Sequence, residues 1–350
     1  MRALTLLPGT ADSLELTDFR EPSDDEGSVL VETIAVGICG TDKEIVAGDY
    51  GEAPAGDERL VLGHESLGRV RSAPSGADVS EGDLVVAIVR HPDPVPCVNC
   101  AVDQWDMCRN GKYTEHGIKG RHGFMRERYR VEPHRLVVVD AALGELGVLL
   151  EPTSVVVKAW EQVDHASARS AYRPQTALIT GAGPIGLLAA MIGVQRGLDV
   201  TVLDQVTSGV KPDIVRDLGA TYTSDPVDEL GFAPDVVLEC TGVPQVVVDA
   251  MRASSVDGVT CLTGVSSVGR SLSLDVGELG RDIVLQNDVV VGSVNANRGH
   301  YDRGAKALAA AEQQWLGRLV TRREPLERHA EALAAQEDDV KVVLQVADAP

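Results

Sequence analysis

Residues 176–204 limit the possible folds more than any other segment of the chain. A short β-forming run at 177–180 leads into the turn GAGPIG (181–186), and an apolar stretch with helical periodicity follows. A second β-forming run at 200–203 ends at Asp204. This order of strand, glycine turn, helix, strand and acid predicts one βαβ unit of an open parallel sheet.

The glycine turn is typical of a dinucleotide-binding site. Gly181 would let the chain turn tightly, Gly183 would let the backbone approach a pyrophosphate, and Gly186 would let the helix pack against the strand. Pro184 and Ile185 open the helix, whose N-terminus attracts phosphate. A flexible turn between core elements is the alternative interpretation.

Asp204 bears on the choice between the two nicotinamide dinucleotides. It lies about 20 residues beyond the glycines, where a carboxylate accepts hydrogen bonds from the adenosine ribose and repels a 2′-phosphate. Only Lys211 lies near it, and no arginine follows closely. The sequence therefore favours NAD, with NADP as the alternative.

The length and composition suit a two-domain globular protein. The 350 residues exceed an ordinary single domain, and a hydrophobic content of 44% supports a full core. The sequence contains no uncharged apolar window of about 18 residues, so we expect no membrane span. Polar and acidic residues interrupt the N-terminal segment too early for a signal peptide, so we expect a cytoplasmic protein.

The chain is strongly acidic, because 53 acidic and 32 basic residues give a net charge of −21. This balance makes nucleic acids and anionic membranes unsuitable partners. The acidic residues are dispersed along the chain, and salt screens their mutual repulsion, with a Debye length of roughly 3 Å at 1 M. We therefore expect a salt-requiring protein from a halophile, and an ordinary acidic cytosolic enzyme is the alternative.

Three further motifs precede the glycine turn. Residues 37–42 read Gly-Ile-Cys-Gly-Thr-Asp and suggest a turn, residues 63–65 read Gly-His-Glu, and residues 82–86 read Gly-Asp-Leu-Val-Val. In this order, and followed by the βαβ unit, they resemble the zinc-dependent medium-chain dehydrogenase/reductase superfamily over essentially the whole chain. The resemblance implies an α/β plus β-barrel fold. A GroES-like catalytic domain would occupy 1–155 and 301–350, and an inserted Rossmann domain, a doubly wound parallel sheet, would occupy 156–300.

The resemblance also implies a catalytic zinc. Cys39 and His64 match two ligand positions of the family, and either Glu65 or Glu151 could supply an oxygen as the third ligand. A zinc ion with one open position acts as a Lewis acid on a bound hydroxyl. A zinc-free relative of the quinone-reductase type is the alternative, but such relatives lack the Cys/His pair.

Two neighbours of Cys39 match further positions of the family. Thr41 matches the hydroxyl that passes the substrate proton on. Asp42 matches the carboxylate that orients the ligand histidine. Thr41, Cys39, His64 and Glu151 form the expected catalytic set.

Residues 97–108 resemble the structural zinc lobe of the family, C-x2-C-x2-C-x7-C. Cys97, Cys100 and Cys108 match its last three positions, whereas Pro94 stands at the first. Asp93 could donate an oxygen in its place, since zinc accepts carboxylates. We expect a second, structural zinc here, and free thiols in a degenerate lobe are the alternative.

Residues 112–127, with shorter motifs near 151 and 294, resemble the archaeal glucose (aldose) 1-dehydrogenase branch. In that branch the residues that match Glu115, Glu151 and Asn295 bind sugar hydroxyls, and Thr41 is expected to face the substrate with them. Each buried sugar hydroxyl needs such a partner, because an unpaired one costs affinity. A solvated loop acid is the alternative for Glu115.

After the glycine unit, helix-like and strand-like segments alternate as in a doubly wound sheet. Helices are expected at 151–166, 213–218, 245–253, 305–313 and 326–335, and strands at 28–34, 236–239, 259–263, 289–293 and 340–346. Ligands of such sheets bind beyond the strand ends. The expected dinucleotide-binding residues are therefore Gly181, Gly183, Pro184, Ile185, Gly186, Asp204, Thr241, Gly242, Thr263, Gly264, Val265, Ser293 and Asn295. Asn297 and His300 follow in the last of these loops.

The leading hypothesis is oxidation of the C1 hydroxyl of an aldose to the aldonolactone, with hydride transfer to NAD(P). The cofactor carries the hydride chemistry and the protein supplies orientation and charge. One alternative is a zinc-dependent polyol, alcohol or threonine dehydrogenase of the same superfamily. Another is a non-catalytic nucleotide-binding protein. We expect a homodimer or homotetramer.

Overall fold

The computed structural model describes residues 1–265 and 271–347, and the chain divides into two compact units. The first unit comprises Met1–Ser154 and Ala296–Pro350, and the second comprises Val155–Asn295. Residues 348–350, the end of the expected catalytic domain, lie outside the described residues. No helix in the described ranges is long and apolar enough to cross a membrane.

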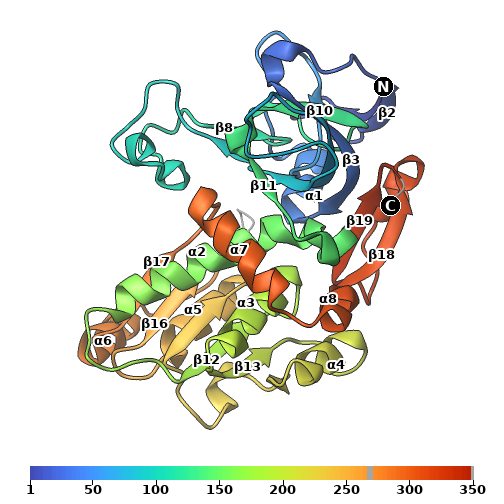
Figure 1. Ribbon diagram of the computed structural model, residues 1–350. Coiled ribbons are helices and arrows are strands. Elements are labelled where there is room, and N and C mark those ends of the chain that lie inside the picture. The colour runs from blue at the N-terminus through green and yellow to red at the C-terminus, as the bar shows by residue number, and fades with distance from the viewer. Residues whose placement is uncertain (266–270, 348–350) are drawn as a thin grey trace. The chain divides into compact units, whose positions relative to one another are not determined.

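The first unit is built mainly from antiparallel strands (Figure 1). They are β1 (Arg2–Leu6), β2 (Glu15–Asp18), β3 (Val29–Ile38), β4 (Leu60–Val61), β5 (Glu65–Ser72), β6 (Leu84–Ala87), β7 (Arg90–His91), β8 (Thr114–His116), β9 (Gly120–Arg121), β10 (Arg128–Val131), β11 (Leu136–Val138), β18 (Val320–Pro325) and β19 (Lys341–Gln345). The largest sheet has the order β11-β6-β5-β3-β19-β18, and β10 also pairs with β3. The smaller sheets are β2-β1-β4 and β7-β8-β9.

The strand β3 is longer than predicted and runs directly into a helix. It continues beyond 34 to Ile38 because the C-terminal strand β19 pairs with it from Ala35 to Ile38. The helix α1 (Gly40–Ala47) begins two residues later, with Cys39 as its N-cap. The turn predicted at 37–42 is therefore wrong, because these residues form a strand-to-helix junction.

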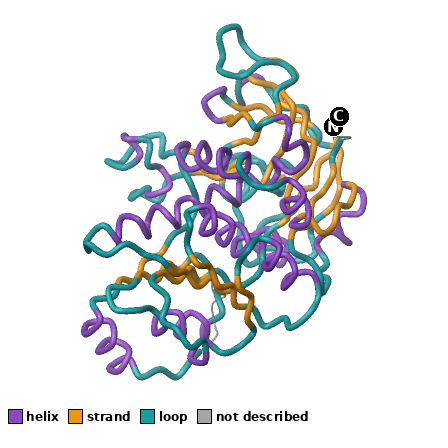
Figure 2. The backbone as a smooth tube through the Cα atoms, turned by 60° about the horizontal axis from the view of Figure 1, so that its bottom comes forward, coloured by secondary structure: helices purple, strands orange, loops and turns teal. Residues whose placement is uncertain are grey.

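The second unit contains a six-stranded parallel sheet, which Figure 2 shows with helices on both faces. Its strands are β12 (Thr176–Thr180), β13 (Asp199–Leu203), β14 (Thr221–Thr223), β15 (Val236–Glu239), β16 (Val259–Leu262) and β17 (Val289–Gly292). The helices in this part of the chain are α2 (Leu150–Ser167), α3 (Pro184–Gln195), α4 (Val210–Asp217), α5 (Pro244–Ala253) and α6 (Val276–Gln286). The strand order is β14-β13-β12-β15-β16-β17. The chain adds strands first on one side of β12 and then, from β15 on, on its other side, as in dinucleotide-binding doubly wound sheets. The predicted fold class is confirmed.

The C-terminal helices differ from the prediction. α7 (Arg298–Ala309) begins earlier than 305 because Asn297 caps it, and the Nδ1 atom of His300 accepts a hydrogen bond from the Asn297 N–H at 2.9 Å. Asn297 and His300 thus start a helix instead of lying in a loop. The helix α8 (Gln313–Leu319) was not predicted, nor was α6. The predicted helix at 326–335 is shorter and consists of the 3-10 turn η7 (Leu326–Arg328) and α9 (His329–Leu333).

A histidine pair lies in the interior of the first unit. The Nε2 atoms of His91 and His116 are 3.0 Å apart, and His116 is buried. The Nδ1 atom of His116 lies 2.7 Å from the backbone oxygen of His122, which can only accept, so Nδ1 carries the proton and Nε2 accepts from His91. Burial lowers the pKa of His116 to about 3, and it also lowers the pKa of His91. Both rings are therefore neutral in the folded chain at mildly acidic pH.

The free energy of unfolding should fall as the pH drops from about 6.5 toward 5, because the unfolded chain takes up protons that the folded chain excludes. Each histidine contributes up to about 1.4 kcal/mol per pH unit. His91→Gln, whose amide can still donate to His116, should reduce this slope, as measured by denaturant unfolding across this pH range. The exposed His165→Gln is the matched control. An equal slope in both variants would contradict the prediction.

Candidate metal centres and dinucleotide site

Cys39, His64 and Glu65 come together from two paired strands of the first unit. Cys39 follows β3, His64 precedes β5, and Glu65 begins β5. The register of β3 and β5 places Gly37 opposite Glu65. The Sγ atom of Cys39 lies 3.0 Å from Nε2 of His64, and one ligand atom from each of the three residues lies within 4.8 Å of the others. Strand pairing thus brings a thiol, an imidazole and a carboxylate to one point.

Asp42 holds the imidazole of His64 from its other side. Its buried Oδ1 atom lies 3.2 Å from Nδ1 of His64, and its Oδ2 atom accepts a hydrogen bond from the Cys39 N–H at 2.9 Å. Burial alone would lower the pKa of His64, but the Cys39 and Asp42 charges outweigh it and the pKa is raised well above its ordinary value. Thr41 lies half-buried beside Asp42 in the first turn of α1. Asp42 therefore fixes the orientation in which Nε2 faces the thiol.

Glu65 also contacts a lysine that the sequence analysis missed. Lys341, the first residue of β19, forms an ion pair with Oε2 of Glu65 and donates to the Ile38 backbone oxygen at 3.0 Å. Both charged side chains are almost completely buried. Burial lowers the pKa of Lys341, but Glu65 outweighs this effect and the pKa is raised. Gly37 makes room for the pair, because a Cβ atom there would lie 2.1 Å from Oε2 of Glu65.

Glu151, the other candidate oxygen ligand, is the second residue of α2 and is buried. Its carboxylate does not belong to the group of atoms within 4.8 Å. Burial raises the pKa of Glu151 to about 7, and the neighbouring Glu65 charge adds to the rise. A carboxyl group with this pKa can take up or release a proton at neutral pH.

The donor set of the Cys39 group suits zinc. A thiolate, an imidazole and a carboxylate are all zinc ligands, and three protein ligands leave the fourth position open, as catalytic sites require. Asp42 is the carboxylate partner that a metal-bound histidine normally has. The residues present therefore fit a zinc ion held by Cys39 and His64, with an oxygen from Glu65 or Glu151.

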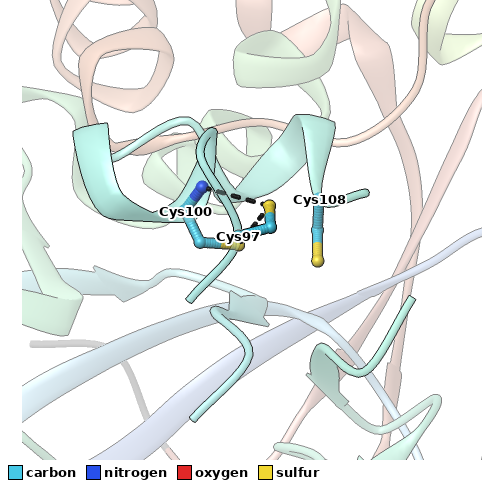
Figure 3. Close-up of side chains that lie close together, drawn as sticks. All are labelled: Cys97, Cys100 and Cys108. Atoms are coloured by element: carbon cyan, nitrogen blue, oxygen red, sulfur yellow. Dashed lines mark hydrogen bonds between the residues drawn. The ribbon is translucent and has the colours of Figure 1, made fainter. Parts of the chain in front are cut away.

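A second group of metal-binding side chains lies in the segment between β7 and β8, which extends away from the strands of the first unit in Figure 1. The thiols of Cys97, Cys100 and Cys108 lie within 4.8 Å of one another (Figure 3). The N–H groups of Arg109 and Cys100 donate to Sγ of Cys97 at 3.3 and 3.5 Å. These bonds lower the pKa of Cys97 to about 6, which favours the thiolate form that binds metals.

Asp93 does not belong to this thiol group. Its Oδ1 atom accepts a hydrogen bond from the Val95 N–H, and its Oδ2 atom accepts one from the Asn110 side chain, each at 2.8 Å. The carboxylate therefore shapes the lobe through these two bonds. The structure brings together the three predicted thiols but not the predicted fourth ligand.

Glu115, the predicted sugar ligand, lies in β8 and is buried rather than solvated. Its Oε1 atom accepts a hydrogen bond from Nε of Arg90 at 3.0 Å and forms an ion pair with Nη2 of Arg90, also at 3.0 Å. Arg90 is its partner in the register of β7 and β8. The Arg90 guanidinium also lies 3.7 Å from the centre of the Tyr113 ring. Arg90 was not predicted from the sequence, because only strand pairing shows that it faces Glu115.

The glycine turn of the second unit has the geometry of a phosphate cradle. Gly181 has a left-handed φ of 88°, and a Cβ atom at Gly186 would lie 1.8 Å from the Gly181 oxygen, so the helix can approach the turn only without a side chain. Gly183 caps α3, and a Cβ atom there would meet nothing within 4 Å. Pro184 and Ile185 form the first turn of α3. The open backbone at the helix N-terminus fits a pyrophosphate group.

Asp204 follows β13 and is fixed beside this turn. Its Oδ2 atom accepts a hydrogen bond from the Ala182 N–H at 2.6 Å, and its Oδ1 atom accepts one from the Val206 N–H at 3.1 Å. Each carboxylate oxygen has a second lone pair that can accept a hydrogen bond from a ribose hydroxyl. The ribose contact itself stays a prediction.

The remaining predicted dinucleotide ligands follow the strands β15, β16 and β17, whose carboxyl ends share one edge of the sheet. Ser293 is buried, Asn295 has a left-handed φ of 63°, and Val265 is 72% exposed. The other members of this set, at the ends of β15 and β16, are Thr241, Gly242, Thr263 and Gly264.

The two units and their sites define the class of protein, a zinc-type medium-chain dehydrogenase with a GroES-like unit and a Rossmann-like sheet. The family profile "Alcohol dehydrogenase GroES-like domain" matches residues 25–141, and "Glucose dehydrogenase C-terminus" matches residues 144–346. The chain belongs to the glucose dehydrogenase family, which confirms the resemblance found in the sequence.

Relatives called glucose 1-dehydrogenase match this chain over its full length. The protein from Methanocella arvoryzae is 40% identical over 359 aligned residues, and that from Thermoproteus tenax is 42% identical over 352. Each alignment covers 99% of both chains. A solved structure of Haloferax mediterranei glucose dehydrogenase in complex with NADP, Zn and gluconolactone superposes with a TM-score of 0.91 at 32% identity, covering 99% of this chain and 100% of that one.

Proposed function

We propose that this protein oxidises the C1 hydroxyl of an aldose to the aldonolactone and transfers hydride to NAD(P). The observation that carries the proposal is the Cys39–His64–Glu65 group in a chain similar to glucose 1-dehydrogenases over its whole length. The zinc, NADP and gluconolactone named for the Haloferax structure support the same chemistry. In this proposal, residues 1–155 and 301–350 carry the metal ligands and the sugar ligands Glu115 and Glu151, and residues 156–300 carry the dinucleotide ligands and the sugar ligand Asn295.

The roles of the metal-site residues follow from their contacts. Cys39 and His64 would hold the ion, which when bound polarises the sugar hydroxyl as a Lewis acid. Asp42 keeps the His64 ring in its ligating orientation. The reaction removes a proton from the C1 hydroxyl and a hydride from C1, and the Thr41 hydroxyl would accept that proton and pass it toward solvent. A buried carboxyl such as Glu151, with a pKa of about 7, can assist this proton transfer.

The Asp204 carboxylate supports NAD as the preferred cofactor. It is fixed beside the glycine turn by two backbone N–H groups, so its negative charge cannot easily move away from a 2′-phosphate. The Haloferax relative is described with NADP, so both dinucleotides belong in the assay.

A substrate panel tests the proposal. Purified protein with added zinc, in molar salt, should reduce NAD faster than NADP when supplied with aldoses. Polyols, simple alcohols and threonine should be poorer substrates. Turnover of polyols or threonine in preference to every aldose would indicate a polyol or threonine dehydrogenase of the same superfamily. Binding of NADH with no turnover of any substrate would indicate a non-catalytic nucleotide-binding protein.

Glu115→Gln should raise KM for aldoses by on the order of tenfold, because a neutral amide loses a charge-assisted hydrogen bond to a sugar hydroxyl. KM for a simple alcohol should stay near the wild-type value. Steady-state kinetics on both substrate types measures the difference, with the exposed Glu58→Gln as the matched control. Equal changes for sugars and alcohols would remove Glu115 from the sugar site.

The surface of the second unit supports a homo-oligomer. The helix α6 exposes Val276, Val284 and Leu285 by 65–74%, and β17 has a strand neighbour on one side only within the described part of the sheet. The free edge of β17, which consists of valines and a glycine, and the apolar side chains of α6 can pair with the same surface of a second copy of the chain. Light scattering should give the mass of a dimer or tetramer, and Val284→Glu should shift it toward the monomer. A monomeric wild-type mass would contradict this arrangement.

A further inference from the structure

Glu239, the last residue of β15, is a buried carboxylate at the carboxyl edge of the parallel sheet. Its Oε1 atom accepts hydrogen bonds from the Thr180 hydroxyl at 3.2 Å and from the Thr241 and Gly242 N–H groups at 2.7 and 3.1 Å. The Thr241 hydroxyl also donates to Oε1, and the Gly242 N–H lies 3.2 Å from Oε2. The side chain therefore collects several donors from two loops at the sheet edge.

The backbone of Glu239 holds a third loop. Its carbonyl oxygen accepts hydrogen bonds from the N–H groups of Thr263 and Gly264 at 2.8 and 3.0 Å, and from the Thr263 hydroxyl at 2.8 Å. Thr180 immediately precedes the glycine turn, whereas the other donors follow β15 and β16. One residue thus joins three of the loops to which the dinucleotide ligands were assigned.

The loops around Glu239 fit together without spare room. A Cβ atom at Gly264 would lie 2.1 Å from the Gly242 nitrogen and 2.8 Å from Oε2 of Glu239. A Cβ atom at Gly181 would lie 2.9 Å from the Thr241 methyl group. A shift of the Glu239 side chain must therefore move the turns around it.

We infer that Glu239 is a positioning residue that sets the shape of the dinucleotide-binding edge, an inference that rests on the proposed function. All groups around its carboxylate are donors, so an acceptor-only side chain is required there. An amide at this position would turn an N–H group toward the donating Gly242 N–H and push that loop away. The oxygens of Glu239 are used by the loops, so Glu239 acts through these loops and not by touching the dinucleotide.

The test measures dinucleotide affinity in the absence of sugar, by titration of NADH fluorescence. Glu239→Gln should raise the Kd for NADH at least tenfold, whereas zinc content should not change. Thr260→Val is the matched control, since it removes a buried hydroxyl-to-carbonyl bond in the neighbouring strand away from this edge. Thr180→Val, which removes one donor from Glu239 and keeps the acid, should raise Kd by a smaller factor and serves if Glu239→Gln does not fold.

An unchanged Kd in a folded Glu239→Gln variant, or an equal rise in Thr260→Val, would overturn the positioning role. If Glu239→Gln does not fold and Thr180→Val leaves the Kd at the wild-type value, the positioning role is overturned as well. Failure of the proposed function looks different. Wild-type protein that binds NADH and oxidises no aldose would contradict the proposed reaction, while the comparison of Kd values would still decide the role of Glu239.

Discussion

Cys39→Ser should lower kcat for aldose oxidation by a factor on the order of 10³, because Lewis-acid stabilisation worth several kcal/mol is lost with the metal. The thiol is one of three ligand atoms that lie within 4.8 Å of one another, and a serine hydroxyl is a far weaker zinc ligand. NADH affinity should stay near the wild-type value, because the glycine turn belongs to the other unit. Kinetics, metal analysis and NADH titration on the same preparation measure all three.

Cys108→Ser is the matched control for this experiment. It alters the thiol group of the lobe, which contains no residue of the Cys39 group. We expect it to lose a second zinc ion while it keeps aldose turnover. Full activity in Cys39→Ser with zinc still bound would exclude the assigned metal role.

Lys341→Met should destabilise the protein by about 3 to 5 kcal/mol, because it leaves the buried Glu65 carboxylate without its partner. This corresponds to a fall in Tm on the order of 10 °C. The loss should be larger after treatment with a chelator than with zinc present, because a bound cation would balance the Glu65 charge. Thermal unfolding with and without chelator measures both values.

Glu65→Gln in the Lys341→Met background provides the control, since it removes the uncompensated charge. The double variant should recover part of the lost stability, as expected for two residues that interact directly. A double variant that loses the sum of the two single effects would contradict a direct Glu65–Lys341 interaction. Equal losses with and without chelator would show that the cation does not balance Glu65.

The sequence predicted the glycine-turn part of the second unit closely, because its signals are local. The glycine turn, the helix after it and the acid at 204 lie within one βαβ unit, and β12, α3 and β13 occupy the expected places. Residues 236–239 match β15 without a shift. Fold class and family followed from these motifs and from the Cys39 and His64 positions.

The missed features depend on pairings between distant segments. Nothing near Lys341 in the sequence indicates that β19 will place it against Glu65, and Arg90 meets Glu115 only through the register of β7 and β8. Glu239 looks like an ordinary strand end until the donors of three loops surround it. Helix starts were also missed where the cap is a short side-chain motif, as at Asn297.

The pairing of β19 with β3 has a consequence for the order in which the protein matures on the ribosome. Lys341, which neutralises Glu65, is synthesised after the Rossmann-like unit, whereas both strands of the pair around Cys39 and His64 are synthesised before it. Domains generally fold as units during synthesis. The Rossmann-like unit can therefore complete its sheet before β19 has been made, and the Glu65 carboxylate gains its buried partner only when β19 pairs with β3.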